Sequence, residues 1–257
     1  MLTIDLSGRK ALVTGGARGI GAGIVRALAE CGASVAFTHL GTERGHAAAG
    51  GLLAELAAQE RRALCFVAAA EDAQAMSTAV ASAAEQLGGL DIVVPNVGLN
   101  WVAALEELDL GGWRRALDLN LTASFVAVKA TLPWLLKAGR ADIVLIGSSA
   151  VFDGGGGGAH YAAAKAGLDG MMRALMRELP RKGIRINMVH PCVVDTDLLR
   201  ERYDSEEKRA RLIAQVPLGR LAQPADIGNL VAYLCSDLGS FICGQSILVD
   251  GGRTLWR

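Results

Sequence analysis

The sequence is poor in aromatic residues, in proline and in net charge. Aromatic residues make up 5% of its 257 residues, six residues are proline, and 26 Lys and Arg balance 26 Asp and Glu. Zero net charge argues against electrostatic capture of nucleic acid or of an anionic membrane, so we expect neither as a partner. No run reaches the roughly 18 uncharged apolar residues that a membrane-spanning helix requires.

Cysteine pairs are also missing. The five cysteines are widely spaced and form no Cys-x-x-Cys pair, so neither a zinc site nor a dithiol redox motif is predicted. We expect buried or unreactive thiols, no bound metal and a cytoplasmic location. The first ten residues lack the basic start and the apolar core of a secretory signal.

The chain instead alternates short apolar runs with longer segments of helical periodicity. The predicted strands are Lys10–Thr14, Ser34–Thr38, Ala63–Val67, Leu90–Val94, Ala141–Ile146, Arg185–His190 and Gln245–Val249. Most of these runs are continuously apolar, as in strands that are covered on both faces. This pattern predicts an α/β fold: one Rossmann-type domain over residues 1–257, with a doubly wound sheet of about seven mostly parallel strands. The alanine-rich stretch from Ala47 to Ala84 is interpreted as two helices that flank a strand.

A glycine-rich turn follows the first predicted strand. The segment reads Thr14-Gly-Gly-Ala-Arg-Gly-Ile-Gly21 and leads into a helical pattern. Its glycines remove Cβ atoms where a pyrophosphate would lie against backbone N–H groups at a helix N-terminus. We predict a dinucleotide site, with a simple packing turn as the alternative. The predicted contacts in this turn are Gly15, Arg18, Gly19, Ile20 and Gly21.

The end of the second predicted strand indicates which dinucleotide binds. The segment Ser34-Val-Ala-Phe-Thr-His-Leu-Gly41 contains no acidic residue that could bind a ribose 2′-hydroxyl. We therefore predict that Arg18, helped by Thr38 and His39, binds the 2′-phosphate of NADP(H). The alternative is NAD(H), with Arg18 as a solvated loop charge.

Tyr161 and Lys165 lie four residues apart at the start of a predicted helix, so their side chains share one face. An ordinary tyrosine has a pKa of about 10. A neighbouring ammonium and a positive nicotinamide ring would lower that pKa toward neutrality and allow acid–base catalysis. The Tyr-x-x-x-Lys pattern is common by itself, so its context decides the interpretation.

Taken together, the motifs resemble the short-chain dehydrogenase/reductase superfamily, in its compact branch and its 3-oxoacyl-carrier-protein reductase-like members. The resemblance covers essentially the whole chain, with the motifs in the family order. The matching segments are Thr14–Gly21, Pro95–Gly98, Asn120, Ile146–Ser149, Tyr161 with Lys165, Ile186–Pro191, Pro217–Arg220, Ser240–Gln245 and Val249–Gly252.

The resemblance implies a role for each matching residue. Tyr161 is the general acid/base, Lys165 binds the nicotinamide ribose and lowers the tyrosine pKa, and Ser148 stabilises charge on the substrate oxygen, with Ser149 as the competing candidate. Asn120 holds a water in a proton relay; the alternative is an amide that satisfies a helix irregularity. The further cofactor contacts that the resemblance implies are Asn96, Gly98, Val194 and Thr196.

Three positions depart from the family pattern. Pro95 replaces an Asn and lacks an N–H group, Ala69 stands where an Asp often contacts adenine, and Cys192 replaces the glycine after Pro191. We expect Cys192 to be packed rather than catalytic. None of these changes removes a group that transfers a proton.

Three variable segments are expected to frame the substrate pocket: Leu99–Val102, the loop Val151–Gly158 and a lid around Asp195–Val216. Five successive glycines in the loop indicate either mobility or a close backbone approach. The basic residues of the lid are expected to form a solvated helix face, with docking of an acidic carrier protein as the alternative. The sequence does not name the substrate.

The predicted function is an NADP(H)-dependent oxidoreductase that transfers a hydride between nicotinamide and a ketone or secondary alcohol. The alternatives are an NAD-dependent sugar or alcohol dehydrogenase and a non-catalytic NADP-sensing scaffold. The resemblance also implies a homotetramer, formed through Trp113–Lys137, His160–Pro180 and Pro224–Arg257. In this assembly Trp256 is expected to pack on a neighbouring subunit.

Overall fold

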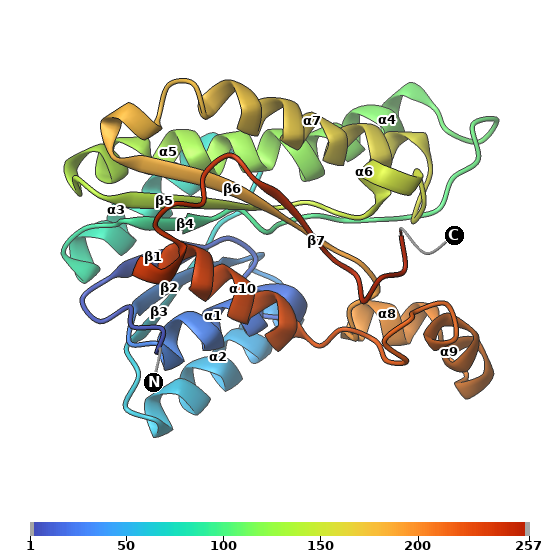
Figure 1. Ribbon diagram of the computed structural model, residues 1–257, viewed down its shortest axis with the longest axis horizontal. Helices are drawn as coiled ribbons and strands as arrows, with labels where there is room; N and C mark the ends of the chain where they lie inside the picture. The colour runs from blue at the N-terminus through green and yellow to red at the C-terminus, as the bar shows by residue number, and fades with distance from the viewer. Residues whose placement is uncertain (1–2, 255–257) are drawn as a thin grey trace.

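A seven-stranded parallel sheet forms the centre of the computed structural model, which describes residues 3–254 (Figure 1). The strands are β1 (Lys10–Val13), β2 (Ser34–His39), β3 (Ala63–Val67), β4 (Ile92–Val94), β5 (Ala141–Ile146), β6 (Ile184–Pro191) and β7 (Ser246–Val249). Their order across the sheet is β3-β2-β1-β4-β5-β6-β7, and every neighbouring pair is parallel. The predicted doubly wound Rossmann-type fold is confirmed.

All seven predicted strands are present, with ends that differ by one or two residues. The largest difference is at β4, which begins at Ile92 rather than at Leu90. Asp91 has another role, because its carboxylate accepts hydrogen bonds from the Arg9 side chain at 2.5 Å and from the Lys10 backbone at 3.1 Å.

The helices cover both faces of the sheet. They are α1 (Gly19–Glu30), α2 (Glu43–Ala58), α3 (Ala73–Leu87), α4 (Leu110–Leu117), α5 (Ala123–Lys137), α6 (Ala150–Asp153), α7 (Ala159–Leu175), α8 (Asp197–Arg202), α9 (Glu206–Ile213) and α10 (Pro224–Cys235). Figure 1 shows α1, α2 and α10 on one face and α3, α5 and α7 on the other, where two further apolar clusters form. The alanine-rich stretch forms α2, β3 and α3, as predicted.

Helices α4 and α5 are joined by a π-helical segment, Asp118–Thr122, into one apolar helix. Over Leu110–Lys137 this helix is long and apolar enough to cross a membrane by length and composition, with a mean hydropathy of 1.3. It packs on α3, α7 and β5 instead, and its buried side chains join the apolar clusters on that face of the sheet.

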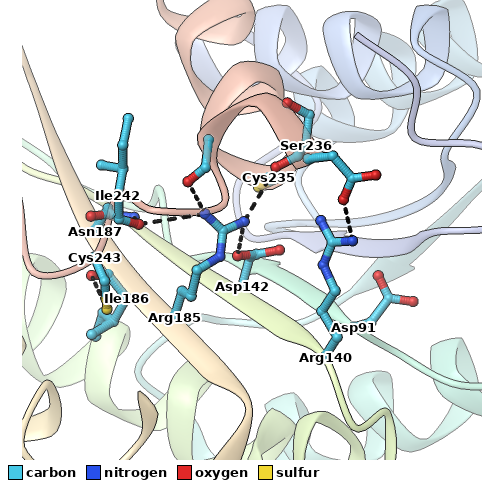
Figure 2. Close-up of polar contacts among 12 residues, drawn as sticks. Asp91, Arg140, Asp142, Arg185, Ile186, Asn187, Cys235, Ser236, Ile242 and Cys243 are labelled. Atoms are coloured by element: carbon cyan, nitrogen blue, oxygen red, sulfur yellow. Dashed lines mark hydrogen bonds and ion pairs between the residues drawn. The ribbon is translucent and has the colours of Figure 1, made fainter.

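An ionic cluster links the amino ends of the central strands to the end of α10. The Asp142 carboxylate is 3% exposed and lies 2.8 Å from the Arg9 guanidinium and 2.7 Å from that of Arg185. Figure 2 shows Arg185 between Asp142 and the backbone of Ser236, just after α10. Charges this deep require partners, because an unpaired buried charge is very costly. The cluster lies at the end of the sheet opposite the glycine turn.

Helices α1 and α10 pack closely because both carry a glycine at their crossing. A Cβ on Gly228 would lie 2.4 Å from the backbone oxygen of Gly23, and a Cβ on Gly23 would lie 2.5 Å from Pro224. The helix that follows the glycine turn is thereby held against the sheet.

Candidate active site

The glycine turn lies at the carboxyl end of β1, beside the point where the strand order reverses. This crevice between β1 and β4 is where doubly wound sheets bind ligands. Gly15 and Gly19 have φ values of +63° and +52°, and a Cβ on Gly21 would lie 2.2 Å from the Gly15 oxygen. Each of the three predicted glycines is therefore needed for the backbone of the turn.

The start of α1 suits a pyrophosphate. Arg18 is the N-cap residue, but no side chain accepts a hydrogen bond from the first-turn N–H groups, and that turn contains no acidic residue. These N–H groups and the positive end of the helix dipole favour an anion. The residues present therefore fit a dinucleotide. Ile20 lines the adjoining cavity.

Asn96 connects the turn to the end of β4. Its side-chain amide donates to the backbone oxygens of Thr14 and Gly15 at 3.1 and 3.3 Å, and its N–H donates to the Thr14 hydroxyl at 3.0 Å. Pro95 has no N–H group, but its oxygen still pairs with β5 by accepting a hydrogen bond from Ile146 N at 3.1 Å. Asn96 thus holds the two strand ends at the crevice together.

The three residues predicted to bind a 2′-phosphate differ in their placement. Arg18 is exposed at the mouth of the turn. Thr38 is 1% exposed, and its hydroxyl accepts from Gly15 N at 3.4 Å, while His39 is 5% exposed with Nδ1 3.1 Å from the Leu40 oxygen. Thr38 therefore supports the glycine turn, His39 contacts the backbone of the loop after β2, and Arg18 is the accessible cation among the three.

The adenine side offers no replacement for the missing acid at Ala69. The Asp72 carboxylate caps α3, where it accepts from the N–H groups of Gln74 and Ala75 at 2.9 and 3.0 Å. The role of Asp72 is therefore local and structural.

Tyr161 and Lys165 project from the first turns of α7, which begins directly after Gly158. The Lys165 Nζ lies 6.0 Å from the centre of the Tyr161 ring and donates to the Ile146 oxygen at 3.1 Å. Burial lowers the pKa of Lys165 to about 8. Burial also raises the pKa of Tyr161, and the hydrogen bond with Ser148 offsets only part of that rise. With the protein groups alone, Tyr161 therefore keeps its proton at neutral pH.

Asn120 lies in the π-helical segment and is fully buried. Its Oδ1 accepts from Leu99 N at 3.1 Å, while its Nδ2 donates to the oxygens of Leu99 and Ala116 at 2.9 and 3.1 Å. A Cβ on Gly98 would lie 2.8 Å from Asn120 Oδ1 and 2.9 Å from Lys165 Nζ. Gly98 therefore leaves the space that separates these two groups. Through its bond to the Ala116 oxygen the amide satisfies the helix irregularity, and the role of Asn120 in a proton relay stays a prediction.

Ser148 follows β5, and its hydroxyl lies close enough to Tyr161 to lower the pKa of that tyrosine. Ser149 is 7% exposed and has no such contact with the tyrosine among the described residues. Behind Ser148, the fully buried His190 of β6 places Nδ1 3.2 Å from Ser148 N and Nε2 3.6 Å from the Asp169 carboxylate. Burial lowers the pKa of His190, so a neutral ring supports the Ser148 backbone.

A cavity of about 990 Å³ opens beside this group. Ser148 and Tyr161 line it together with Trp101, the glycine loop and the lid. The loop approaches its neighbours closely: Asn100 donates to the Gly156 oxygen at 2.7 Å, Ala103 N donates to the Gly157 oxygen at 3.0 Å, and a Cβ on Gly157 would lie 1.9 Å from Asn100 Oδ1. Close backbone approach, one of the two expected explanations for these glycines, is therefore confirmed.

The predicted lid forms α8 and α9. Its apolar side chains Leu198, Leu199 and Tyr203 face the cavity. Its charged side chains pair with one another on the outside, as in Arg200 with Asp195 at 2.8 Å and Arg211 with Glu207 at 2.6 Å. The expected solvated helix face is therefore present.

The segment after β6 brings three further residues to the cavity. Val194 and Thr196 line it, and Thr196 also lies across the turn from Gly19, where a Cβ would be 3.3 Å from its methyl group. Cys192 is 6% exposed, so it is packed as expected, and its sulfur accepts a hydrogen bond from Arg253 at 3.2 Å.

Sequence reasoning missed His190 and Arg253 as members of the site, and it included Asn100 only within the predicted pocket segment Leu99–Val102. Asn100 and His190 are held by backbone groups, which no residue pattern reveals. For Arg253 a signal existed, because a lone arginine follows the last predicted strand and its Asp-Gly-Gly turn. The predicted packing of Trp256 lies outside the described residues.

This crevice, with its glycine turn and its buried tyrosine–lysine pair, defines a pyridine-nucleotide-dependent dehydrogenase or reductase. A sequence model of the family described as enoyl-(acyl carrier protein) reductase matches residues 15–254. The chain belongs to the short-chain dehydrogenase/reductase superfamily.

Curated relatives match along nearly the whole chain. The L-rhamnose 1-dehydrogenase (NAD(P)(+)) of Azotobacter vinelandii is 34% identical, with 98% of each chain covered. The 3-oxoacyl-[acyl-carrier-protein] reductase FabG of Escherichia coli is 35% identical, with 97% of this chain and 98% of the relative covered. Among solved structures, a blue fluorescent protein from a metagenomic library in complex with NADPH is 38% identical, with a TM-score of 0.88 and coverage of 97% and 99%.

Proposed function

We propose that this protein is an NADP(H)-dependent oxidoreductase that interconverts a ketone and a secondary alcohol. The observation that carries the proposal is the position of Ser148 and Tyr161 together at the wall of one cavity that adjoins the glycine turn. When bound, the nicotinamide would donate or accept the hydride. The residues of this chain then bind the cofactor, orient the substrate and move a proton.

Proton transfer is assigned to Tyr161. Since burial raises the pKa of Tyr161, its hydroxyl is protonated at neutral pH and suits donation to a carbonyl oxygen during reduction. Ser148 would donate a hydrogen bond to the same oxygen and stabilise the charge that develops there. Lys165 would hold the nicotinamide ribose, and Asn120 would hold a water of the proton relay behind the tyrosine. Both side chains lie next to Gly98.

The first test is Tyr161→Phe. We expect turnover of a ketone panel, followed through nicotinamide absorbance, to fall at least about 100-fold, because general acid catalysis contributes about 10²–10⁴. NADPH binding, measured by fluorescence titration, should stay within twofold of the wild type. Unchanged turnover would contradict the enzyme and favour the non-catalytic sensor.

The choice of NADP(H) is supported by the acid-free end of β2 and by the exposed Arg18. The nearby Arg44 lies 2.7 Å from Glu201 of the lid, so its charge is already engaged. Arg18→Ala should reduce the ratio of kcat/KM for NADPH over NADH by about 10- to 100-fold, the contribution of a charged hydrogen bond. Arg177→Ala, on an exposed turn, is the control that should leave the ratio unchanged. A wild-type preference for NADH would contradict the assignment.

We also propose a small-molecule substrate rather than one carried by an acidic protein. Residues 197–213 of the lid contain five acidic and five basic side chains, so the lid presents no net positive surface. The proposed assembly is a homotetramer, supported by apolar side chains on exposed surfaces, including Phe125 of α5 at 54% and Phe241 at 101% exposure. Light scattering of the pure protein tests the assembly, and a stable monomer would contradict it.

A further inference from the structure

The segment after β7 turns back over the cavity and is held firmly. The Asp250 carboxylate accepts from the N–H groups of Gly252 at 2.9 Å and Thr254 at 2.6 Å. The Gly251 oxygen accepts from Leu218 N at 3.2 Å. Both Gly251 and Gly252 have positive φ values, +64° and +88°, which suits the tight turn. The turn fixes the direction of the next side chain, Arg253.

Arg253 reaches the cavity that Ser148 and Tyr161 line. Its Nη1 donates to the Cys192 sulfur at 3.2 Å, and its Nη2 donates to the Gln215 amide oxygen at 2.8 Å. Its Nε is buried and has no hydrogen-bond partner among the described residues. A thiol sulfur is a weak acceptor, so the guanidinium is poorly satisfied.

Arg253 also has no carboxylate within 4.0 Å among residues 3–254, and its hydrogen bonds reach only the Cys192 sulfur and the Gln215 amide. The cavity-lining Glu201 is paired with Arg44, and Asp153 accepts from Gly155 N at 2.9 Å. Neither acid is available to Arg253. A half-buried cation without a counter-ion has lost hydration that an anionic ligand would replace.

We propose that Arg253 binds a carboxylate of the substrate, so that the substrate is an oxo acid or the corresponding hydroxy acid. This inference rests on the proposed function, since it places the acid group in the cavity that Ser148 and Tyr161 also line. The planar guanidinium can offer two N–H groups to one carboxylate. Exchange of the weak sulfur contact for a carboxylate oxygen would complete its hydrogen bonding.

The first test measures the preference for an acid over its ester. The probes are 2-oxo-, 3-oxo- and 4-oxopentanoate, each paired with its methyl ester, in steady-state reduction by NADPH. One of the three acids should have the spacing between carbonyl and carboxylate that fits the site. For this acid, Arg253→Gln should lower the ratio of kcat/KM for acid over ester by about 10- to 100-fold, mostly through KM. Arg253→Lys should retain part of the preference. Arg177→Gln, which removes an exposed charge, should retain all of it.

A binding measurement separates this inference from the proposed function. In the Tyr161→Phe background, calorimetry with NADPH present compares the same acids and esters with and without Arg253→Gln. If an acid binds more tightly than its ester and Arg253→Gln removes this difference in affinity, the result supports the inference even where no carbonyl is turned over. Esters that are reduced as well as acids, with a ratio that Arg253→Gln leaves unchanged, would overturn the inference and leave the oxidoreductase standing. Absence of any acid preference in the calorimetry would also overturn it.

Discussion

Lys165 shows at the scale of one residue how function opposes stability. Its side chain is 3% exposed, and its ammonium has one hydrogen bond, to the Ile146 oxygen at 3.1 Å. Burial lowers the pKa of Lys165 from 10.5 to about 8, so below pH 8 the folded protein holds a charge that the unfolded chain holds more easily. A buried ammonium at this position lowers the stability of the fold. Its presence is explained by a site that needs a cation beside a tyrosine.

Lys165→Met should therefore stabilise the protein at pH 7 while abolishing turnover. The lowered pKa of Lys165 corresponds to at most about 3 kcal/mol of unfolding free energy, from which about 1 kcal/mol is subtracted for the lost hydrogen bond. Between pH 8 and 10.5 the unfolded chain binds more protons than the folded one, so the wild type gains stability from this residue as pH rises and the difference between the two proteins shrinks. Urea unfolding at pH 7 and pH 9.5 measures this difference in stability between the wild type and Lys165→Met. Lys129→Met, exposed on α5, is the control. Destabilisation by Lys165→Met at pH 7 would contradict the argument.

Residue patterns predicted much of the site, and the reason is local geometry. Gly15, Gly19 and Gly21 are required by positive φ values or by close backbone contact within one turn, which sequence records directly. The pair Tyr161 and Lys165 shares a helix face for the same local reason. His190 reaches the site only through the pairing of β5 and β6, and no local pattern predicts such a distant contact.

At the scale of elements, the glycine loop after α6 behaves as a wall of the cavity. Its backbone oxygens accept from Asn100 at 2.7 Å, from Ala103 N at 3.0 Å and from Arg202 of α8 at 3.1 Å. The segment after β4 and helix α8 therefore both bind the loop through the carbonyl groups of Gly156 and Gly157. The sequence allowed either a mobile loop or a tightly packed one, since glycine permits both. Only the position of Asn100 decides between them.

Gly157→Ala should disturb this wall. The new Cβ would lie 1.9 Å from Asn100 Oδ1 and 2.7 Å from the Trp101 oxygen, so the loop must move. We expect kcat/KM for the carbonyl substrate to fall about 10- to 100-fold, as for a displacement of about 1 Å at a reacting group, with NADPH affinity within twofold of the wild type. The control is Gly50→Ala in α2, where a Cβ meets nothing within 4 Å. That variant should gain about 0.4–1 kcal/mol in thermal unfolding and keep full activity. Full activity of Gly157→Ala would show that the loop is free to yield.

At the scale of the whole molecule, structure and chemistry occupy opposite ends of the sheet. The Arg9, Asp142 and Arg185 cluster joins β5 and β6 to the end of α10 at the amino end, and Figure 2 shows its Asp142–Arg185 pair. The cavity lies at the carboxyl end. The parallel direction of the strands and the doubly wound sheet were predictable from the alternating pattern. The ionic cluster was not, because its three members come from three separate segments of the chain.

Asp142→Asn should therefore destabilise the protein and leave its chemistry intact. Loss of the carboxylate leaves two partly buried guanidinium groups with fewer partners, a change that costs about 3–5 kcal/mol. Urea unfolding measures this loss, and kcat at a temperature below unfolding should remain within about twofold of the wild type. The control is Asp237→Asn, because Asp237 is 83% exposed in its pair with Arg140 and should contribute less than about 1 kcal/mol. Equal effects of the two variants would contradict a special role for burial.

The crossing of α1 and α10 has a consequence for how the chain acquires its structure. Gly23 and Gly228 touch through backbone atoms although roughly 200 residues separate them, a feature of high contact order that slows folding. A fragment that stops before Pro224 would leave the inner side of α1 uncovered. Such a fragment should therefore fail to retain dinucleotide, although every residue of its phosphate-binding turn is present.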